Sequence, residues 1–198
     1  MTIQGFWCTF LTNVYKDNRN DSMTLMVADS SALILLAKCG LLEIVCDFFD
    51  VIVPAAVIIK VSSEKLVKNY PDAALISALT SEGAIKVQSP GSDRPPIPIS
   101  LHKGEEEALL LAIKLGRSLL ATDDGKAIKA ARFFNVPFLV TPKIVVELFR
   151  LQKISLRKAR ESLKKLGKIG RYSPEIIADA LIVLMEKEDG KANNHKDT

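Results

Sequence analysis

Residues 24–38 read TLMVADSSALILLAK, which is a short apolar run, an aspartate, and a second apolar run that begins with two serines. The first run, Leu25–Ala28, is continuously apolar and has the length of a buried strand. Either serine can cap a following helix, and Gly40 is placed to end that helix. A strand followed at once by a helix is the repeating unit of parallel α/β sheets, so this stretch predicts the fold class.

The same alternation continues along the chain. Four further apolar runs have strand length, and helical patterns separate each run from the next. No hairpin turn joins two of these runs, so the connections are crossovers and the strands are parallel. We therefore predict an α/β fold with a five-stranded parallel sheet, flanked by helices, in the order 3-2-1-4-5. The later strands are expected at Val51–Val53, Ala84–Val87, Ser118–Thr122 and Val136–Val140.

Length and composition limit the kind of protein. The chain has 198 residues, of which 48% are apolar, and this suits one compact domain and excludes a disordered protein. Three cysteines and two histidines without a Cys-x-x-Cys motif favour reduced thiols in a cytoplasmic protein over disulfides or structural zinc. No apolar stretch approaches the ~20 residues that cross a bilayer, so no membrane contact is expected. We divide the chain into a poorly defined tail (1–22), the α/β domain (23–152) and a basic helical extension with a polar tail (153–198).

Carboxylates follow two strands that the predicted order makes neighbours. Asp29 comes after the first strand, and Asp123 and Asp124 come after the fourth. Ligands of open α/β sheets bind beyond the carboxyl ends of the strands, where the winding direction reverses, so these acids are expected to share one cleft. Glu107 is expected to join them, because it lies at the edge of an otherwise apolar helix that begins near Gly104.

Gathered carboxylates indicate a cation. Two such charges about 5 Å apart repel one another by ~3 kcal/mol at an effective dielectric constant of about 20. A hard ion such as Mg²⁺ or Mn²⁺ relieves this repulsion and prefers oxygen ligands. Such an ion suits phosphodiester hydrolysis, because it polarises the phosphate and acidifies a water molecule. The hydroxyls of Ser30 and Thr122 flank the acids and are expected to position ligands or phosphate, with helix capping and strand packing as the alternatives.

Four motifs occur in a fixed order. They are V-x-D-S-S-x-L-I-x-L-A-K-x-G-x-L at 27–42, V-I-V-P-x-x-V at 51–57, G-E-x-E-A-L at 104–109 and L-L-x-T-D-D at 119–124. This ordered set resembles the PIN domain family, in particular the prokaryotic subgroup with a G-E-x-E-A helix start, over residues 24–180.

The resemblance implies a function as well as a fold. It implies a Mg²⁺- or Mn²⁺-dependent ribonuclease, often the toxin of a toxin–antitoxin pair. By position, the catalytic and metal-binding acids fall on Asp29, Glu107 and Asp123, with Asp124 adjacent. One departure is Lys60, which stands where the family usually carries an acid. Glu64, four residues later, could substitute for that acid on the same helix face, and a plain surface position is the alternative.

Charge is unevenly distributed. Residues 143–171 carry ten basic and two acidic side chains, although the whole chain has a net charge of only +4. This asymmetry indicates a polyanionic partner, and an ordinary solvated helix face is the alternative. Contacts with an RNA backbone or with a protein partner are expected from Arg157, Lys158, Lys164 and Lys165.

The leading prediction is a metal-dependent endoribonuclease that acts on RNA, with a protein antitoxin and a homo-oligomer as further expected partners. A degenerate PIN domain that binds RNA or protein without cutting is the alternative, and Lys60 motivates it. A phosphotransfer domain with Asp29 as nucleophile has little support, because the second acid of a D-x-D start is missing.

Overall fold

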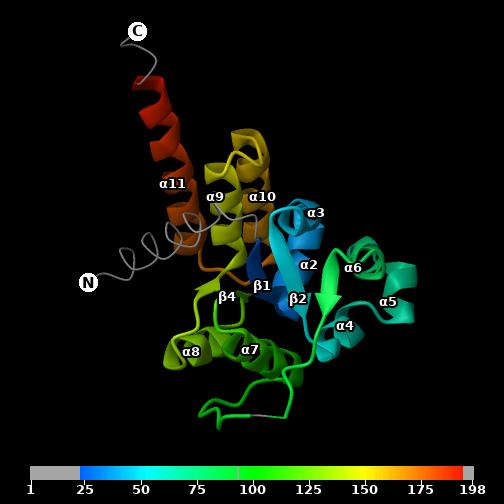
Figure 1. The fold of residues 1–198 in the computed structure, drawn as a ribbon. Coiled ribbons are helices and arrows are strands. Elements are labelled where there is room, and N and C mark those ends of the chain that lie inside the picture. Colours follow the sequence, from blue (N-terminus) through cyan, green and yellow to red (C-terminus); the bar gives the residue numbers. More distant parts are fainter. Residues whose placement is uncertain (1–22, 93, 194–198) are drawn as a thin grey trace.

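The fold is a parallel α/β sheet in a computed structural model that describes residues 23–92 and 94–193. All five strands are parallel, and their order, β3-β2-β1-β4-β5, confirms the predicted topology (Figure 1). The expected tail at 1–22 lies outside the described residues. The strands are β1 (Thr24–Ala28), β2 (Phe49–Val53), β3 (Ile85–Val87), β4 (Ser118–Ala121) and β5 (Phe138–Leu139).

Helices connect consecutive strands and continue beyond the last one. They are α2 (Ser30–Lys38), α3 (Leu42–Cys46), α4 (Ala55–Val61), α5 (Glu64–Asn69), α6 (Pro71–Ser81), α7 (Lys103–Leu115), α8 (Gly125–Phe133), α9 (Thr141–Arg150), α10 (Leu156–Ile169) and α11 (Pro174–Asn193).

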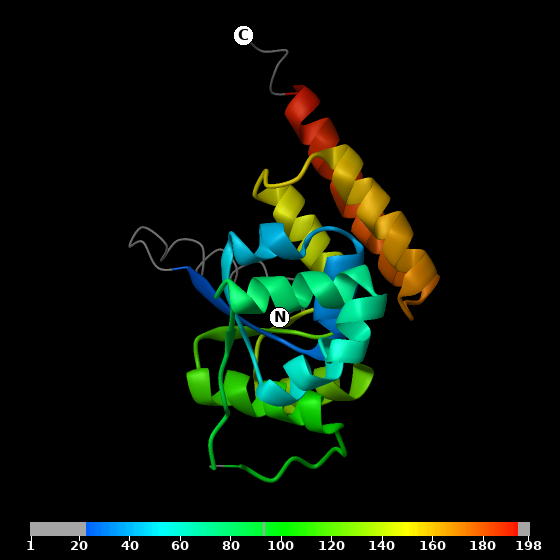
Figure 2. The ribbon, with the colours of Figure 1, turned by 90° about the vertical axis from the view of Figure 1, so that its right-hand side faces the viewer.

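The sheet separates two apolar cores, because successive side chains of a strand point to opposite faces. In β1, Met26 and Ala28 enter the larger core, whereas Val27 enters the smaller one. Residues of α2, α6, α9 and α10 complete the larger core, and residues of α7 and α8 complete the smaller one. Both faces of the sheet are therefore covered (Figures 1 and 2), which explains why its strands are continuously apolar.

The C-terminal helices pack against the rest of the fold. Helices α9, α10 and α11 contact one another, and Figure 2 shows α10 and α11 side by side. Leu163, Leu166 and Leu184 are completely buried in the same core as Met26. Residues of the expected extension thus share the core of the sheet. Within the described ranges, no helix has the length and apolar character that a membrane span requires.

One local prediction was wrong for an identifiable reason. Asp29, not a serine, caps α2, because its carboxylate reaches the backbone N–H of Ala32. Helix α10 continues through Gly167 to Ile169, and a Cβ at Gly167 would lie 3.7 Å from Ile177, which is an ordinary contact distance.

Candidate active site

Asp29 sits where β1 meets β4. Its backbone N–H donates to the carbonyl of Ala121 (3.0 Å), which continues the pairing of the two strands by one residue. The residue is 1% exposed, and its carboxylate accepts from two hydroxyls and from the backbone N–H groups of Ser31 and Ala32. Oδ1 accepts from Ser31 Oγ (2.6 Å) and Ala32 N (2.9 Å), and Oδ2 accepts from Thr122 Oγ1 (2.5 Å). The expected phosphate-positioning residue Thr122 therefore orients Asp29 here.

Asp123 is held by the C-terminal half of the chain. Its Oδ1 accepts from Thr141 N (2.8 Å) at the start of α9 and from the phenol of Tyr172 (2.6 Å), which lies between α10 and α11. Its Oδ2 accepts from the hydroxyl of Thr141 (2.5 Å). The backbone N–H of Asp123 donates to Ser31 Oγ (3.1 Å), and that hydroxyl in turn donates to Asp29. One hydrogen-bond network thus joins the two carboxylates predicted to meet.

The electrostatics of this network follow from burial. Burial raises the pKa of both Asp29 and Asp123, and their hydrogen bonds partly oppose this effect. The charge of Asp29 raises the pKa of Asp123 further, so the two carboxylates lie within electrostatic reach of each other. Burial and the neighbouring Asp123 raise the pKa of Tyr172, and its phenol therefore remains a proton donor.

Asp124 has a different partner from Asp123. Its Oδ1 accepts from the backbone N–H groups of Lys126 (2.8 Å) and Ala127 (2.9 Å), so it caps the N-terminus of α8. The two adjacent aspartates, which the sequence did not distinguish, are therefore separated by their contacts. Asp123 belongs to the network with Asp29, and Asp124 belongs to a helix end.

Glu107 lies on a face of α7 that approaches the start of α2. A Cβ at Gly104, one turn earlier, would be 3.5 Å from Ser30 Oγ. That hydroxyl is buried without a hydrogen-bond partner. Glu107 is 9% exposed, and among the described residues its carboxylate makes no hydrogen bond or ion pair. Unpaired polar groups are costly in such a position, so both side chains are available to a ligand.

The donor set fits a divalent ion held by two carboxylates. In the part of the chain that the structure describes, no three Asp, Glu, His or Cys side chains gather closely enough to hold a metal, so the expected trio with Glu107 is not assembled. A carboxylate has about four acceptor positions, and Asp123 accepts three hydrogen bonds, so its Oδ2 keeps one position. Asp29 accepts from two hydroxyls and from the backbone N–H groups of Ser31 and Ala32, so an ion would have to displace or share one of these donors. Mg²⁺ commonly binds through one or two carboxylates, with water and phosphate as its other ligands.

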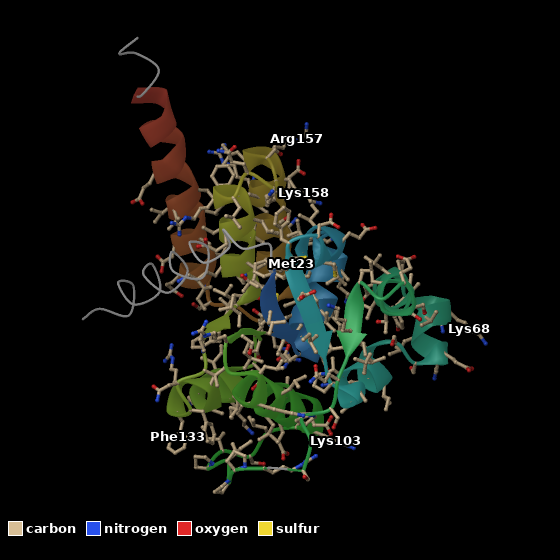
Figure 3. The ribbon with its side chains drawn as sticks, viewed as in Figure 1. Met23, Lys68, Lys103, Phe133, Arg157 and Lys158 are labelled. Atoms are coloured by element: carbon tan, nitrogen blue, oxygen red, sulfur yellow. The ribbon has the colours of Figure 1, made fainter. Side chains whose placement is uncertain are left out.

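A pocket with two lysines in a largely apolar lining lies near Ser30. It has a volume of about 460 Å³ and lies between α4 and α7. Its lining includes Gly104, which lies close to Ser30 in space. Figure 3 labels Lys103, another residue of the lining. The pocket is lined by Ala56, Ile59, Lys60, His102, Lys103 and Gly104.

Glu64 does not lie on the same helix face as Lys60, so it does not replace the acid that the family usually carries at position 60 in the way predicted. Helix α4 ends at Val61, and Glu64 begins a separate helix, α5, where it is exposed. The expected four-residue spacing on one helix face is therefore broken by the turn at Ser62 and Ser63. Lys60 remains the charged residue of α4 that lines the pocket.

Most of the predicted RNA-binding residues of α10 have partners inside the protein. Lys158 donates to the carbonyl of Cys39 (2.9 Å), and Lys165 donates to the carbonyl of Lys38. These contacts satisfy the last carbonyls of α2 with positive charge. Arg157 pairs with Glu161 (2.9 Å), and Lys164 is exposed. Figure 3 shows Arg157 and Lys158 at the end of the molecule opposite Lys103.

Ser31, Thr141 and Tyr172 belong to the network but were not predicted from the sequence as site residues. Thr141 lies two residues after the end of β5, so the rule that pointed to Asp29 and Asp123 could also have pointed to it. Ser31 was interpreted only as a possible cap. Tyr172 carries no sequence signal, because it comes from a connection between two helices.

Comparison with known proteins supports the fold assignment. A comparison with curated proteins found no match. A family model described as a PIN domain matches residues 25–187, which is most of the chain and includes Asp29, Glu107, Asp123 and Tyr172. Because this match covers the whole sheet and extends into α11, the chain belongs to the PIN domain family.

Proposed function

We propose that this chain is a metal-dependent endoribonuclease that hydrolyses phosphodiester bonds of RNA. The family has a nuclease-type fold and is generally dependent on divalent metals. The proposal rests on the pair of Asp29 and Asp123, which follow neighbouring strands and share one hydrogen-bond network.

In this proposal each side chain has one task. Asp29 and Asp123 would hold Mg²⁺ or Mn²⁺, while Thr122 and Thr141 keep the two carboxylates oriented. Ser30 would donate its unpartnered hydroxyl to a phosphate oxygen. Glu107 would act as a third ligand only after moving toward the two aspartates, because these three side chains are not gathered among the described residues. A divalent ion bound there supplies stabilisation of phosphate charge and lowers the pKa of water.

The pocket with two lysines supports RNA as the substrate. Lys60 and Lys103 line the pocket, and Gly104 of the same pocket lies close to Ser30. In this proposal the two lysines would bind phosphates that flank the cleaved bond. Lys164 of α10 would reach only a more distant part of the strand. Lys158 and Lys165 would first have to release the carbonyls of α2.

The test is cleavage of end-labelled single-stranded RNA by the full chain with Mn²⁺ or with EDTA. We expect cleavage only with Mn²⁺ and a loss of at least about 100-fold for Asp29→Asn and for Asp123→Asn. Asp50→Asn is the matched control, because Asp50 lies early in β2 and pairs with Lys86 on the surface. Equal cleavage by the wild type and Asp29→Asn would refute the mechanism.

A degenerate PIN domain that binds RNA or protein without cutting is the second candidate. Lys60, whose positive charge lines the pocket near Ser30, favours it. Calorimetric titration with Mn²⁺ separates the two candidates, since only the nuclease requires metal binding. RNA binding by the degenerate form would weaken with salt by a slope of roughly −0.7 for each neutralised phosphate.

We also propose a toxin role, with an antitoxin or a second copy of the chain as protein partner. Helix α11 projects from the fold in Figure 1 and exposes the apolar side chains of Ile176, Ile182 and Met185. Light scattering of the purified chain, alone and with the product of an adjacent small reading frame, tests this role. A monomer that ignores that product would contradict it.

A further inference from the structure

We propose that Tyr172 is a positioning residue of the metal site and that its phenol determines which oxygen of Asp123 faces the ion. This inference rests on the proposed metal-dependent function. It gives the connection between α10 and α11 a role in orienting Asp123, although this connection is distant in sequence from every predicted acid.

The hydrogen bonds of Asp123 support this assignment. The distance from the Tyr172 hydroxyl to Oδ1 is 2.6 Å, which is typical of a strong hydrogen bond to an ionised carboxylate. Thr141 N donates to the same oxygen (2.8 Å), so both acceptor positions of Oδ1 are filled. Only Oδ2 keeps a free position beside the hydroxyl of Thr141. The phenol therefore fixes the rotation of the carboxylate without occupying the remaining position.

The backbone before Tyr172 is adapted to this ring. A Cβ at Gly170 would lie 2.5 Å from Cδ2 of the Tyr172 ring, which is closer than real side chains approach. The backbone of Gly170 is extended (φ −86°, ψ 161°), so any residue could adopt its conformation. What Gly170 provides is room for the ring to fold back toward Asp123. That Cβ would also lie 2.9 Å from the carbonyl oxygen of Leu166, so a substitution at Gly170 must shift the ring, the end of α10 or both while retaining the hydroxyl.

Two variants test the proposal, with Mn²⁺ affinity of the full chain measured by calorimetry. Tyr172→Phe removes the hydroxyl and keeps the ring, and Gly170→Ala shifts the ring, the end of α10 or both. We expect each to weaken Mn²⁺ binding about 10- to 100-fold, as is usual for groups that orient metal ligands. Tyr70→Phe is the matched control, because Tyr70 is 54% exposed. It should bind Mn²⁺ like the wild type.

The urea midpoint in EDTA distinguishes positioning from a structural role. A merely structural hydroxyl would lower the midpoint of Tyr172→Phe and leave the Mn²⁺ Kd of the folded protein unchanged, which would overturn the proposal. Tighter Mn²⁺ binding by Tyr172→Phe would show that the phenol obstructs the site, and would also overturn it. If Asp29→Asn abolishes binding and Tyr172→Phe does not weaken it, only this inference fails. If the wild type binds no Mn²⁺, the proposed metal site fails as well.

Discussion

Asp123 should be important for stability as well as for metal binding, and two substitutions separate these roles. Asp123→Ala removes the acceptor of three hydrogen bonds and leaves the N–H and hydroxyl of Thr141 and the phenol of Tyr172 without their partner. Hydrogen bonds to a charged group contribute about 1.5–3 kcal/mol each, and relief of a buried charge offsets part of that sum. We expect the free energy of unfolding to fall by about 3 kcal/mol.

Asp123→Asn should cost much less. The amide oxygen can accept from Thr141 N and from Tyr172, and the hydroxyl of Thr141 can turn to accept from the amide nitrogen. We expect a loss of at most about 1 kcal/mol, because the network is kept and the buried charge is removed. Both variants should lose Mn²⁺ binding, since neither offers a carboxylate.

The assay is urea unfolding in EDTA, followed by far-ultraviolet circular dichroism. Asp50→Ala and Asp50→Asn are the controls and remove only a surface ion pair with Lys86 (2.8 Å), which is worth about 0–1 kcal/mol. If Asp123→Ala were as stable as the wild type, or if Asn and Ala at this position cost the same, the hydrogen-bond network would not stabilise the fold as argued.

Three further predictions concern charge and capping. Burial raises the folded-state pKa of Asp29, so the stability of the wild type relative to Asp29→Asn should be greatest below the unfolded pKa of about 4 and should be lost as pH rises from there through the folded pKa; urea midpoints at several pH values measure it, and an opposite trend would contradict the burial argument. Asp124→Ala should cost about 1 kcal/mol of stability through the lost cap of α8, whereas Asp124→Asn should cost little, and both should bind Mn²⁺ like the wild type in calorimetry. Lys60→Ala and Lys103→Ala should each weaken RNA binding and make the salt slope shallower by about 0.7, measured by fluorescence anisotropy at several salt concentrations; unchanged slopes would place the RNA elsewhere.

The sheet could be predicted because its determinants are local. Continuous apolar runs with helical stretches between them specify parallel strands buried on both faces. The rule for carboxyl ends then predicted that Asp29 and Asp123 share one cleft, and hydrogen bonds through Ser31 link the two residues. Helix ends were less predictable, as Asp29 shows, because several polar residues compete for one cap.

The contacts made across the fold could not be read from the sequence. The lysines of α10 resemble a nucleic-acid surface in a linear count, yet Lys158 and Lys165 bind carbonyls of α2 more than a hundred residues away. The phenol on Asp123 also depends on tertiary packing. Local patterns carry no information about which distant partner satisfies a side chain.

The placement of α10 has a consequence for shortening the chain. Its lysines hold the last carbonyls of α2, whose first turn is capped by Asp29, and the loop that leaves α10 delivers a phenol to Asp123. A chain cut after residue 152 would therefore lose more than a surface extension. It would remove Leu163 and Leu166 from the larger core and the Tyr172 hydrogen bond from Asp123, so the smallest stably folded chain is expected to include the final helices.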